Sequence, residues 1–444
     1  MQRKTWFKWI LRLTLGAMVV LLGVAGSQTA RPVSAGQVPS GPGAGTAAVQ
    51  SPSLGSFINI RTNDSIDNWE PVVAYNSTRG EYLVVWWDDD SAVSTQAIYA
   101  QRIDSKGAPV GSQPITVAYY AGHLQWQPDV VYNPTHDEYL VTYTYEAGPG
   151  DWDIWATRLA WDGSAAGPDI WINNATTVQQ NPAVAYDSKH DEYLVVWESE
   201  QGPLTRDIWG QRVDSAGTPQ GGAVCIATSA GDLRTRPDVA YNPAQDNYLI
   251  AYTYQDDAAQ DGDIFAKVAP WNLGPLSGEI EIIYNVNLQD DVALTAGGGE
   301  YLAVWQDGPG SSWRTIYGRR INGDGSIPAA PFVIAEHANL SLSAPDVSYS
   351  AGYGYLVSWD YGTGTTSSYD IYGRYVMPGQ DQACGKEFGI DVGSDRQIDP
   401  AVACNPIGDC LVVYGDDYPV YGEWEIRGRF VIPYHVYLPL TLRN

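Results

Sequence analysis

Short, nearly continuous apolar runs recur along this chain at regular intervals. Residues 81–86 read EYLVVW, and similar six-residue runs begin at residues 138, 192, 247, 300, 354 and 409. A second phrase of the type PDVAYN precedes each run and begins at residues 71, 128, 182, 237, 290, 345 and 400. The period is therefore 53 to 57 residues, and seven copies of one period indicate a repeat architecture.

Each period contains four short runs that favour β-strands. In the third period they are AVAYD, EYLVVW, DIWGQRV and GAVCIAT, rich in Val, Ile, Tyr and Trp and separated by turn residues. Runs as continuous as YLVVW require cover on both faces, which a ring of identical sheets supplies. We therefore predict an all-β chain, a seven-bladed β-propeller of four-stranded antiparallel blades. Separate β-sandwich domains are excluded because about 55 residues are too few for one.

The two ends of the repeat region complement each other. Each fourth strand ends in an apolar segment shortly before the next first strand, and residues 57–60 (FINI) hold that place before Pro71 without a blade ahead of them. The seventh copy stops after its third strand, at residues 425–431. We predict that residues 57–60 complete the last blade as its fourth strand. This pairing would close the ring and hide two sheet edges.

Three segments flank or precede the predicted propeller of residues 56–431. Residues 1–35 combine a basic start with an apolar run that is short for a membrane span, followed by small residues, and predict a signal peptide; a retained anchor is the alternative. Residues 36–55 are rich in Gly, Ala, Pro and Ser and predict a flexible linker. Residues 432–444 form a C-terminal tail, either a sorting tag or an extra edge strand.

The chain is strongly acidic, with a net charge of −26. Without residues 1–35 it would carry 20 basic and 51 acidic residues, a net charge of −31. Such a surface repels nucleic acid and anionic membranes. We therefore expect a protein that is secreted or displayed at the cell surface, that does not insert into membranes after signal removal, and that binds a glycan or a protein. The oligomeric state is left open.

Aromatic residues accompany carboxylates in the loops between second and third strands and in the links between blades. Flat rings beside carboxylates bind sugars by stacking and by hydrogen bonds to hydroxyl groups. The alternative is that these rings cap the blade cores. The candidate ligand-binding residues are Trp126, Trp152, Trp313, Tyr369 and Trp424.

Acidic residues open several of the first strands. We assign them to one column and expect them to surround the mouth of the central channel, where like charges raise one another's pKa unless a cation neutralises them. Calcium is the candidate ion, and no other cofactor is expected. The alternative is hydrogen bonding to the backbone of the next blade. The residues are Asp129, Asp238, Asp291 and Asp346. Carboxylates that end second strands (Asp88, Glu198, Asp360) are further expected to pair with third-strand arginines (Arg102, Arg212, Arg374).

The four cysteines predict one disulfide. Cys404 and Cys410 occupy equivalent points of the first and second strands of the seventh copy, so they flank one hairpin. We favour a Cys404–Cys410 disulfide, with Cys384 as a rival partner and Cys225 as a lone thiol. Such a bond suits an oxidising compartment.

The phrase EYLVVW…DIWGQRVDSAG (192–217), echoed at residues 98–111, resembles a loosely defined group of secreted bacterial β-propeller repeat proteins, most of them uncharacterised. The resemblance covers residues 57–431 and implies the fold but little about function. Our first hypothesis is an exported, non-enzymatic propeller that binds glycan or protein at the cell surface or outside the cell. The alternatives are a polysaccharide-cleaving hydrolase or lyase that uses carboxylates on one face, and a structural component of the cell envelope.

Overall fold

A computed structural model describes residues 51–62, 66–90, 95–202, 205–228, 231–255, 262–308, 313–338, 340–362, 369–418 and 423–433. These residues form 28 β-strands and no helix, which confirms the all-β prediction. Accordingly, no helix that could cross a membrane occurs among them. The predicted signal peptide, residues 36–50 of the predicted linker and residues 434–444 of the tail lie outside the described residues.

Three sheets have four strands each. Their strands are β2 (Asp67–Asn76), β3 (Glu81–Asp90), β4 (Thr95–Ile103) and β5 (Pro109–Ala118); β6 (Gln125–Asn133), β7 (Glu138–Gly148), β8 (Asp151–Ala160) and β9 (Ile170–Asn173); and β18 (Leu288–Gly297), β19 (Glu300–Gly308), β20 (Thr315–Asn322) and β21 (Phe332–Ala335). Every pairing within these three sheets is antiparallel.

Two further sheets have eight strands each, in two halves of four. The first contains β10 (Gln179–Asp187), β11 (Glu192–Gly202), β12 (Thr205–Asp214), β13 (Pro219–Ala227), β14 (Leu233–Asn242), β15 (Asn247–Gln255), β16 (Asp263–Pro270) and β17 (Ile280–Ile283). The second contains β22 (Ser341–Ser350), β23 (Gly354–Gly362), β24 (Tyr369–Val376), β25 (Ala383–Asp391), β26 (Arg396–Cys404), β27 (Cys410–Tyr418), β28 (Glu423–Ile432) and β1 (Ser53–Arg61). A single parallel residue pair joins the halves of each sheet, Arg206 with Leu233 and Tyr369 with Arg396.

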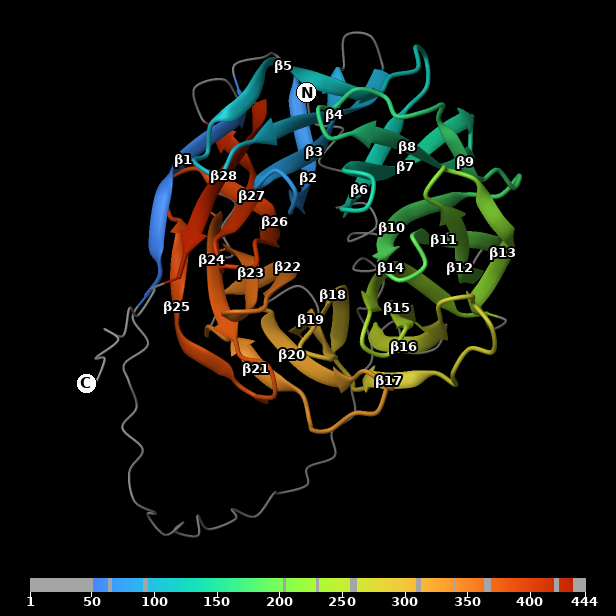
Figure 1. Ribbon diagram of the computed structural model, residues 1–444. Coiled ribbons are helices and arrows are strands. Elements are labelled where there is room, and N and C mark those ends of the chain that lie inside the picture. Colours follow the sequence, from blue (N-terminus) through green and yellow to red (C-terminus); the bar gives the residue numbers. More distant parts are fainter. Residues whose placement is uncertain are drawn as a thin grey trace, which may run out of the picture. The chain divides into compact units, whose positions relative to one another are not determined.

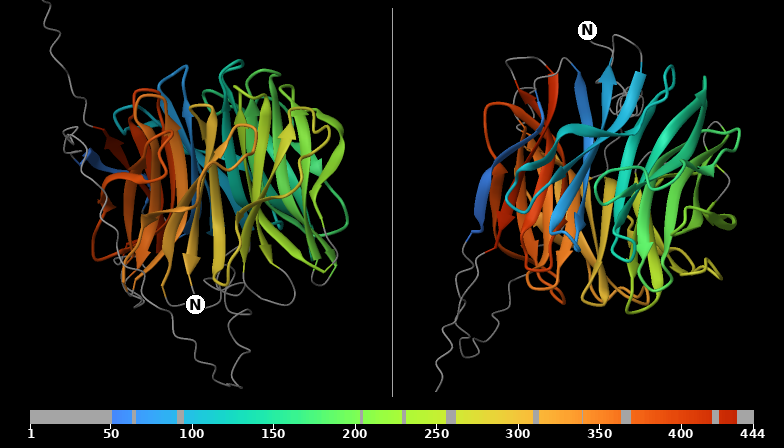
Figure 2. Two further views of the ribbon diagram at one scale, coloured as in Figure 1. Left: turned by 90° about the horizontal axis from the view of Figure 1, so that it is seen from below. Right: turned by 45° about the horizontal axis from the view of Figure 1, so that its top comes forward.

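We call each run of four strands a unit, from β2–β5 to β26–β28 with β1. The first strands of successive units contact one another in sequence, and β26 of the last unit contacts β2 of the first. Figure 1 shows these first strands on the inside of the arrangement and the fourth strands on the outside. In Figure 2 the strands run between two faces on which the connecting loops lie. Residues in loops at one face can therefore be neighbours although they are distant in sequence.

The EYLVVW runs form the second strands and make the centre of each unit. In β11, Leu194, Val195 and Val196 are all fully buried, so both faces of the strand are covered. Small residues such as Ala185 and Ala240 line the first strands, where neighbouring units approach closely. The pattern expected from the sequence is therefore also the packing pattern of the core.

β1 pairs with β28 in antiparallel fashion, with Phe57 opposite Arg429 and Ile58 opposite Gly428. The strand is longer than the predicted residues 57–60, because it begins at Ser53 and so includes the end of the predicted linker. Ile58 and Ile60 are buried against residues of β3, β27 and β28. β1 therefore occupies the outer edge of the unit that contains the last three strands.

Cys404 and Cys410 form a disulfide across the β26–β27 hairpin, at directly paired positions. Cys225 and Cys384 are half-buried free thiols. The structure thus contains the pairing that the sequence favours and not the rival pairing with Cys384.

Candidate functional site

Three of the four aspartates assigned to one column share the same environment. One carboxylate oxygen of each accepts a hydrogen bond from a backbone amide in the first strand of the next unit. The pairs are Asp129 with Val184 at 2.8 Å, Asp238 with Leu294 at 2.6 Å, and Asp346 with Val402 at 2.7 Å. These contacts match the alternative in which the column links neighbouring units through their backbones.

The fourth assignment, Asp291, is wrong. In β6, Asp129 is the first residue after the bulge to pair with the second strand, opposite Thr142. In β18 the corresponding residue is Ala293, opposite Val304, so Ala293 holds the column position in this unit. This fifth copy of the repeat keeps the usual spacing in sequence. Its turn between the first and second strands, however, has two residues, Gly298 and Gly299, instead of the four seen between β6 and β7. The shorter turn moves each residue of β18 by two positions. Asp291 consequently lies in the bulge before the column, with a positive φ of 51°.

Burial raises the pKa of each column aspartate. The pKa is about 6 for Asp129, about 7 for Asp346 and about 8 for Asp238, where the charges of Asp129 and Asp346 add to the effect of burial. The three carboxyl groups therefore lie within electrostatic range of one another around the axis. At neutral pH most Asp238 carboxyls carry a proton.

An ion-pair network lies at the start of the first strands on one side of the axis. Arg236, in the bulge of β14, contacts Asp290 and Asp291 of β18 through Nη1, the latter at 2.6 Å. Its backbone amide donates to Glu198 Oε2 of β11 at 2.8 Å, and Arg206 Nη1 lies 2.5 Å from Glu198 Oε1. Asp290 above all, and Asp291, raise the pKa of Arg236, so its guanidinium stays charged. Carboxylates from two units thus meet around one permanent cation.

Solvent reaches this network unevenly. The Glu198 side chain is 1% exposed, whereas those of Asp291 and Arg236 are 22% and 26% exposed. Glu198 is additionally held by Gln180 Nε2 at 2.6 Å, and Asp291 Oδ2 accepts from Gln306 Nε2 at 2.5 Å. Asp291 and Arg236 are therefore the members that a ligand could touch.

The network does not follow the repeat. Only one unit places an arginine in the bulge of its first strand; the equivalent residues in the other units, which also have positive φ, are Glu70, Gln127, Asn181, Asp291, Ala344 and Asp399. Sequence reasoning missed Arg236 and Asp290; the one signal was that the fifth PDVAYN phrase begins with Asp290 where the other six begin with proline. A group that departs from a repeated scaffold is the better candidate for function.

Other charged pairs do follow the repeat and support the scaffold. Third-strand arginines bind the glutamate that opens the second strand of the same unit. The pairs are Arg102–Glu81, Arg158–Glu138, Arg212–Glu192 and Arg320–Glu300. The predicted pairing of Arg102 with Asp88 and of Arg212 with Glu198 is therefore wrong, because these arginines lie at the opposite end of the second strand. Arg374 instead donates to the backbone carbonyls of Gly385 and Ile334.

The predicted aromatic residues do not form one surface. Trp126 and Trp152 pack edge to face with ring centroids 4.4 Å apart. Trp424 is 7% exposed, and the guanidinium of Arg396 lies over its ring and over that of Tyr369. These environments favour a capping role for Trp424. Trp313 is 47% exposed and remains available to a ligand.

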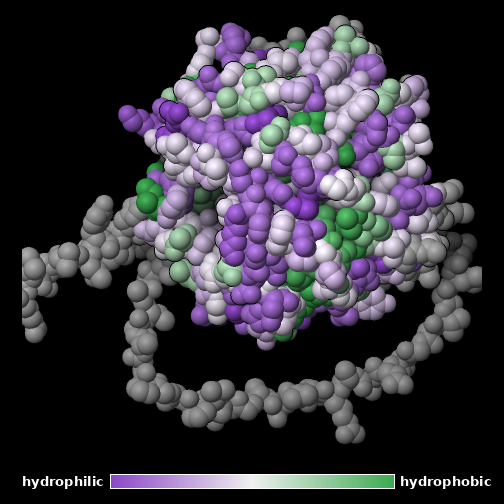
Figure 3. Space-filling view, turned by 45° about the vertical axis from the view of Figure 1, so that its right-hand side comes forward, coloured by the Kyte–Doolittle hydropathy of each residue, from purple (hydrophilic) through white to green (hydrophobic). Residues whose placement is uncertain are grey.

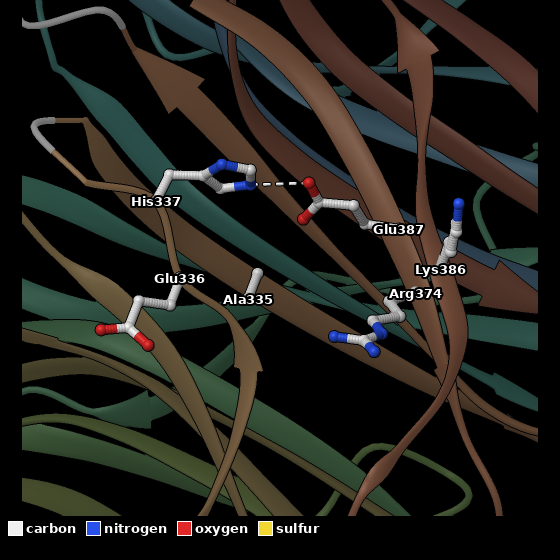
Figure 4. A pocket seen from close by; sticks show the side chains of 6 residues that line it. All are labelled: Ala335, Glu336, His337, Arg374, Lys386 and Glu387. Carbon is white, nitrogen blue, oxygen red and sulfur yellow. Dashed lines mark ion pairs between the residues drawn. The ribbon is translucent and has the colours of Figure 1, made fainter.

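A polar pocket that the sequence did not predict lies beside β21, β24 and β25 (Figure 4). His337 and Glu387 form an ion pair across it, with His337 Nε2 2.6 Å from Glu387 Oε1. Arg374, Lys386 and Glu336 complete its charged lining. The face of the molecule seen in Figure 3 is likewise mostly hydrophilic, with smaller apolar areas between.

Comparison with known proteins supports the fold. No protein-family model matches the chain, and no curated protein matches it. A protein of unknown function from Dyadobacter fermentans has a TM-score of 0.53 at 10% identity, over 85% of this chain and 98% of that chain. The β-propeller domain of the Trilobed protease from Pyrococcus furiosus, described as having an open velcro topology, has a TM-score of 0.50 at 9% identity with the same coverage.

Glycan-cleaving enzymes occur among the more distant solved structures. The NanB sialidase from Streptococcus pneumoniae has a TM-score of 0.46 at 10% identity, over 85% of this chain and 70% of that chain. At these identities the likeness concerns the fold alone. The function of this chain therefore has to be argued from its own residues.

Proposed function

We infer that the chain is a seven-bladed propeller in which each unit is one blade and β1 completes the last. A recurring contact supports this inference: the glycine in the turn between third and fourth strands lies against an isoleucine in the fourth strand of the preceding unit. The glycine–isoleucine pairs are Gly163–Ile115, Gly217–Ile170 and Gly325–Ile280. Gly107 of the first unit lies in the same way against Ile58 of β1.

We propose that this protein cleaves glycans, and that its site is the axial network of Arg236, Asp290, Asp291 and Glu198. The observation that carries the proposal is that, among the described residues, one unit alone has an arginine in its first-strand bulge, with carboxylates of two other units around it. Non-enzymatic binding would favour a site that recurs with the blades. Hydrolysis of a glycosidic bond instead needs one asymmetric pair of carboxyl groups, one protonated and one ionised.

The network and its neighbourhood offer both kinds of carboxyl group. Asp291 is the most accessible carboxylate of the network, lies beside a charged guanidinium and suits the role of base or nucleophile. Asp238 has a pKa of about 8 and suits the role of acid. Both belong to the boundary between β14 and β18, because Asp238 accepts a hydrogen bond from the amide of Leu294. No cofactor is required for this chemistry.

The test is release of reducing sugar from a panel of neutral and basic polysaccharides. We expect the Asp291→Asn variant to lose at least about a hundredfold in rate, since a general acid or base contributes about 10²–10⁴-fold. Asp399→Asn is the matched control, because Asp399 holds the same bulge position in the last unit, also with positive φ. Equal activity of wild type and Asp291→Asn on every cleaved substrate would contradict the proposed site.

The second candidate is glycan binding without cleavage, favoured by the exposed Trp313 and by the paired rings of Trp126 and Trp152. A glycan array separates the two: binding that Trp313→Ala abolishes, with no sugar released from any bound glycan, would favour this candidate. If no glycan is bound or cleaved in these assays, the function would instead be binding of a protein ligand or a structural role in the envelope.

We further propose that the protein is exported, with residues 1–35 as its signal peptide. The disulfide of Cys404 with Cys410 and the acidic composition support an extracellular location. Mass spectrometry of the mature chain tests the proposal, and a chain that retains Met1 after secretion would contradict it.

A further inference from the structure

A contact between neighbouring units recurs at the turns that join first and second strands. An asparagine side chain that ends a first strand donates to an aspartate in the turn of the next unit. The pairs are Asn76–Asp137 and Asn133–Asp191, both at 3.1 Å. At the following boundary the asparagine position holds Asp187, and the turn of the next unit holds Asp246. Two carboxyl groups therefore meet at this boundary, whereas the two preceding boundaries each pair an amide with a carboxyl group.

His190 lies between these two carboxylates. Its Nδ1 is 2.8 Å from Asp187 Oδ2 and 3.5 Å from Asp246 Oδ1, and the three atoms lie within 4.8 Å of one another. The ring of Trp271 stacks on the imidazole with centroids 3.9 Å apart and an interplanar angle of 11°. The imidazole is therefore fixed with Nδ1 toward both acids.

The two carboxylates are also oriented. The Asp187 side chain is fully buried, and its Oδ1 accepts from the amides of Lys189 and His190 at 2.9 and 3.0 Å, which leaves Oδ2 to face the imidazole. Tyr241 donates to Asp246 Oδ1 at 2.7 Å. Such supporting hydrogen bonds are typical of the surroundings of metal ligands.

We propose that Asp187, His190 and Asp246 bind a divalent transition-metal ion, with Zn²⁺ as the representative ion. Metal–ligand bonds of about 2.0–2.2 Å place neighbouring ligand atoms roughly 3–3.5 Å apart, and the observed separations of 2.8 and 3.5 Å are close to this. One imidazole and two carboxylates suit zinc better than calcium, which prefers oxygen ligands alone. Among the described residues, no other set of three potential ligands is gathered in this way.

This site is separate from the proposed glycan site. Asp187 ends β10 and Asp246 precedes β15, whereas Glu198 and Arg236 lie toward the opposite ends of the strands of these units. The ion would link two neighbouring units across the turns that connect their first and second strands. Sequence reasoning missed it because His190 and Asp246 are far apart in sequence.

The experiment is calorimetric titration of ZnCl₂ into EDTA-treated protein that carries no affinity tag, at pH 7, with CaCl₂ in parallel. We expect one Zn²⁺ per chain and at least tenfold weaker binding of Ca²⁺. Asp187→Asn should weaken Zn²⁺ binding at least tenfold and still fold, because Asn133 occupies the equivalent place in the preceding unit. His190→Ala should weaken it similarly.

His136→Ala is the matched control. His136 lies in the equivalent turn, with Nε2 2.7 Å from Asp191, but its neighbour is Asn133 rather than an aspartate. We expect its removal to leave Zn²⁺ binding unchanged. The proposal is overturned if no Zn²⁺ binds, or if the Asp187→Asn and His190→Ala variants bind it as tightly as wild type.

Discussion

The contribution of β1 can be measured by truncating one buried side chain. Ile60 is 7% exposed and packs with residues of β3, β27 and β28 in one cluster. Its Cδ1 packs against Gly428: a Cβ atom added to this glycine would lie 3.2 Å from Ile60 Cδ1. Replacing a buried isoleucine by alanine costs about 2–5 kcal/mol, through lost transfer free energy and the cavity that remains. We therefore expect Ile60→Ala to lower the free energy of unfolding by about 3 kcal/mol.

The opposite face of the same strand provides the control. Phe57 is 52% exposed, and its one described ring contact is the guanidinium of Arg429 at 4.3 Å. An exposed contact of this kind is worth about 0.5–1 kcal/mol, so Phe57→Ala should cost less than about 1 kcal/mol. Both variants remove a large apolar side chain from one strand, and they differ in burial.

The assay is guanidinium denaturation followed by tryptophan fluorescence, with size-exclusion chromatography of the native proteins. Removal of residues 51–61 as a whole should in addition expose the edge of β28 and produce oligomers. The reasoning fails if Ile60→Ala and Phe57→Ala cost the same, or if the truncated protein stays monomeric with an unchanged melting temperature.

Three further predictions concern the axis and the loops. The folded-state pKa of Asp238 (about 8) is above its unfolded value, so the native state keeps a proton on Asp238 that the unfolded state has lost. The free energy of unfolding of wild type, relative to that of Asp238→Asn, should therefore fall as the pH rises from about 5 to 8. A difference in guanidinium midpoints that does not change with pH would contradict this. A calcium ion shared by Asp129, Asp238 and Asp346 remains a prediction: calcium at about a hundred times its dissociation constant would add about 2.7 kcal/mol to stability, and an equal rise in melting temperature in Asp238→Asn would rule the site out. Trp424→Ala should lower the free energy of unfolding by about 3–5 kcal/mol because the ring is buried. Trp313→Ala should change it by less than about 1 kcal/mol because the ring is exposed. Similar costs for both variants in denaturant titrations would contradict this difference.

The sequence by itself determined the strands, their order and their grouping into fours. These features follow from local patterns: apolar runs such as residues 192–197 favour strands wherever they occur, and turn residues separate them. The Cys404–Cys410 hairpin and the strand near residues 57–60 could be predicted for the same reason, since a repeat shows which of its parts are substituted or displaced.

Only the tertiary structure decided which residues face one another across unit boundaries. The register of β18 depends on a two-residue turn, and this turn removes Asp291 from the column to which its sequence context assigns it. Arg236 meets Asp290 and Asp291, and His190 meets Asp246, across 54 to 56 residues of sequence, so no local pattern relates these pairs. The burial of Trp424 likewise depends on Arg396 and on Trp69 of the first unit. Periodicity specifies a scaffold because each copy repeats it, whereas a functional group arises where the copies differ and the contacts between neighbouring units bring the differences together.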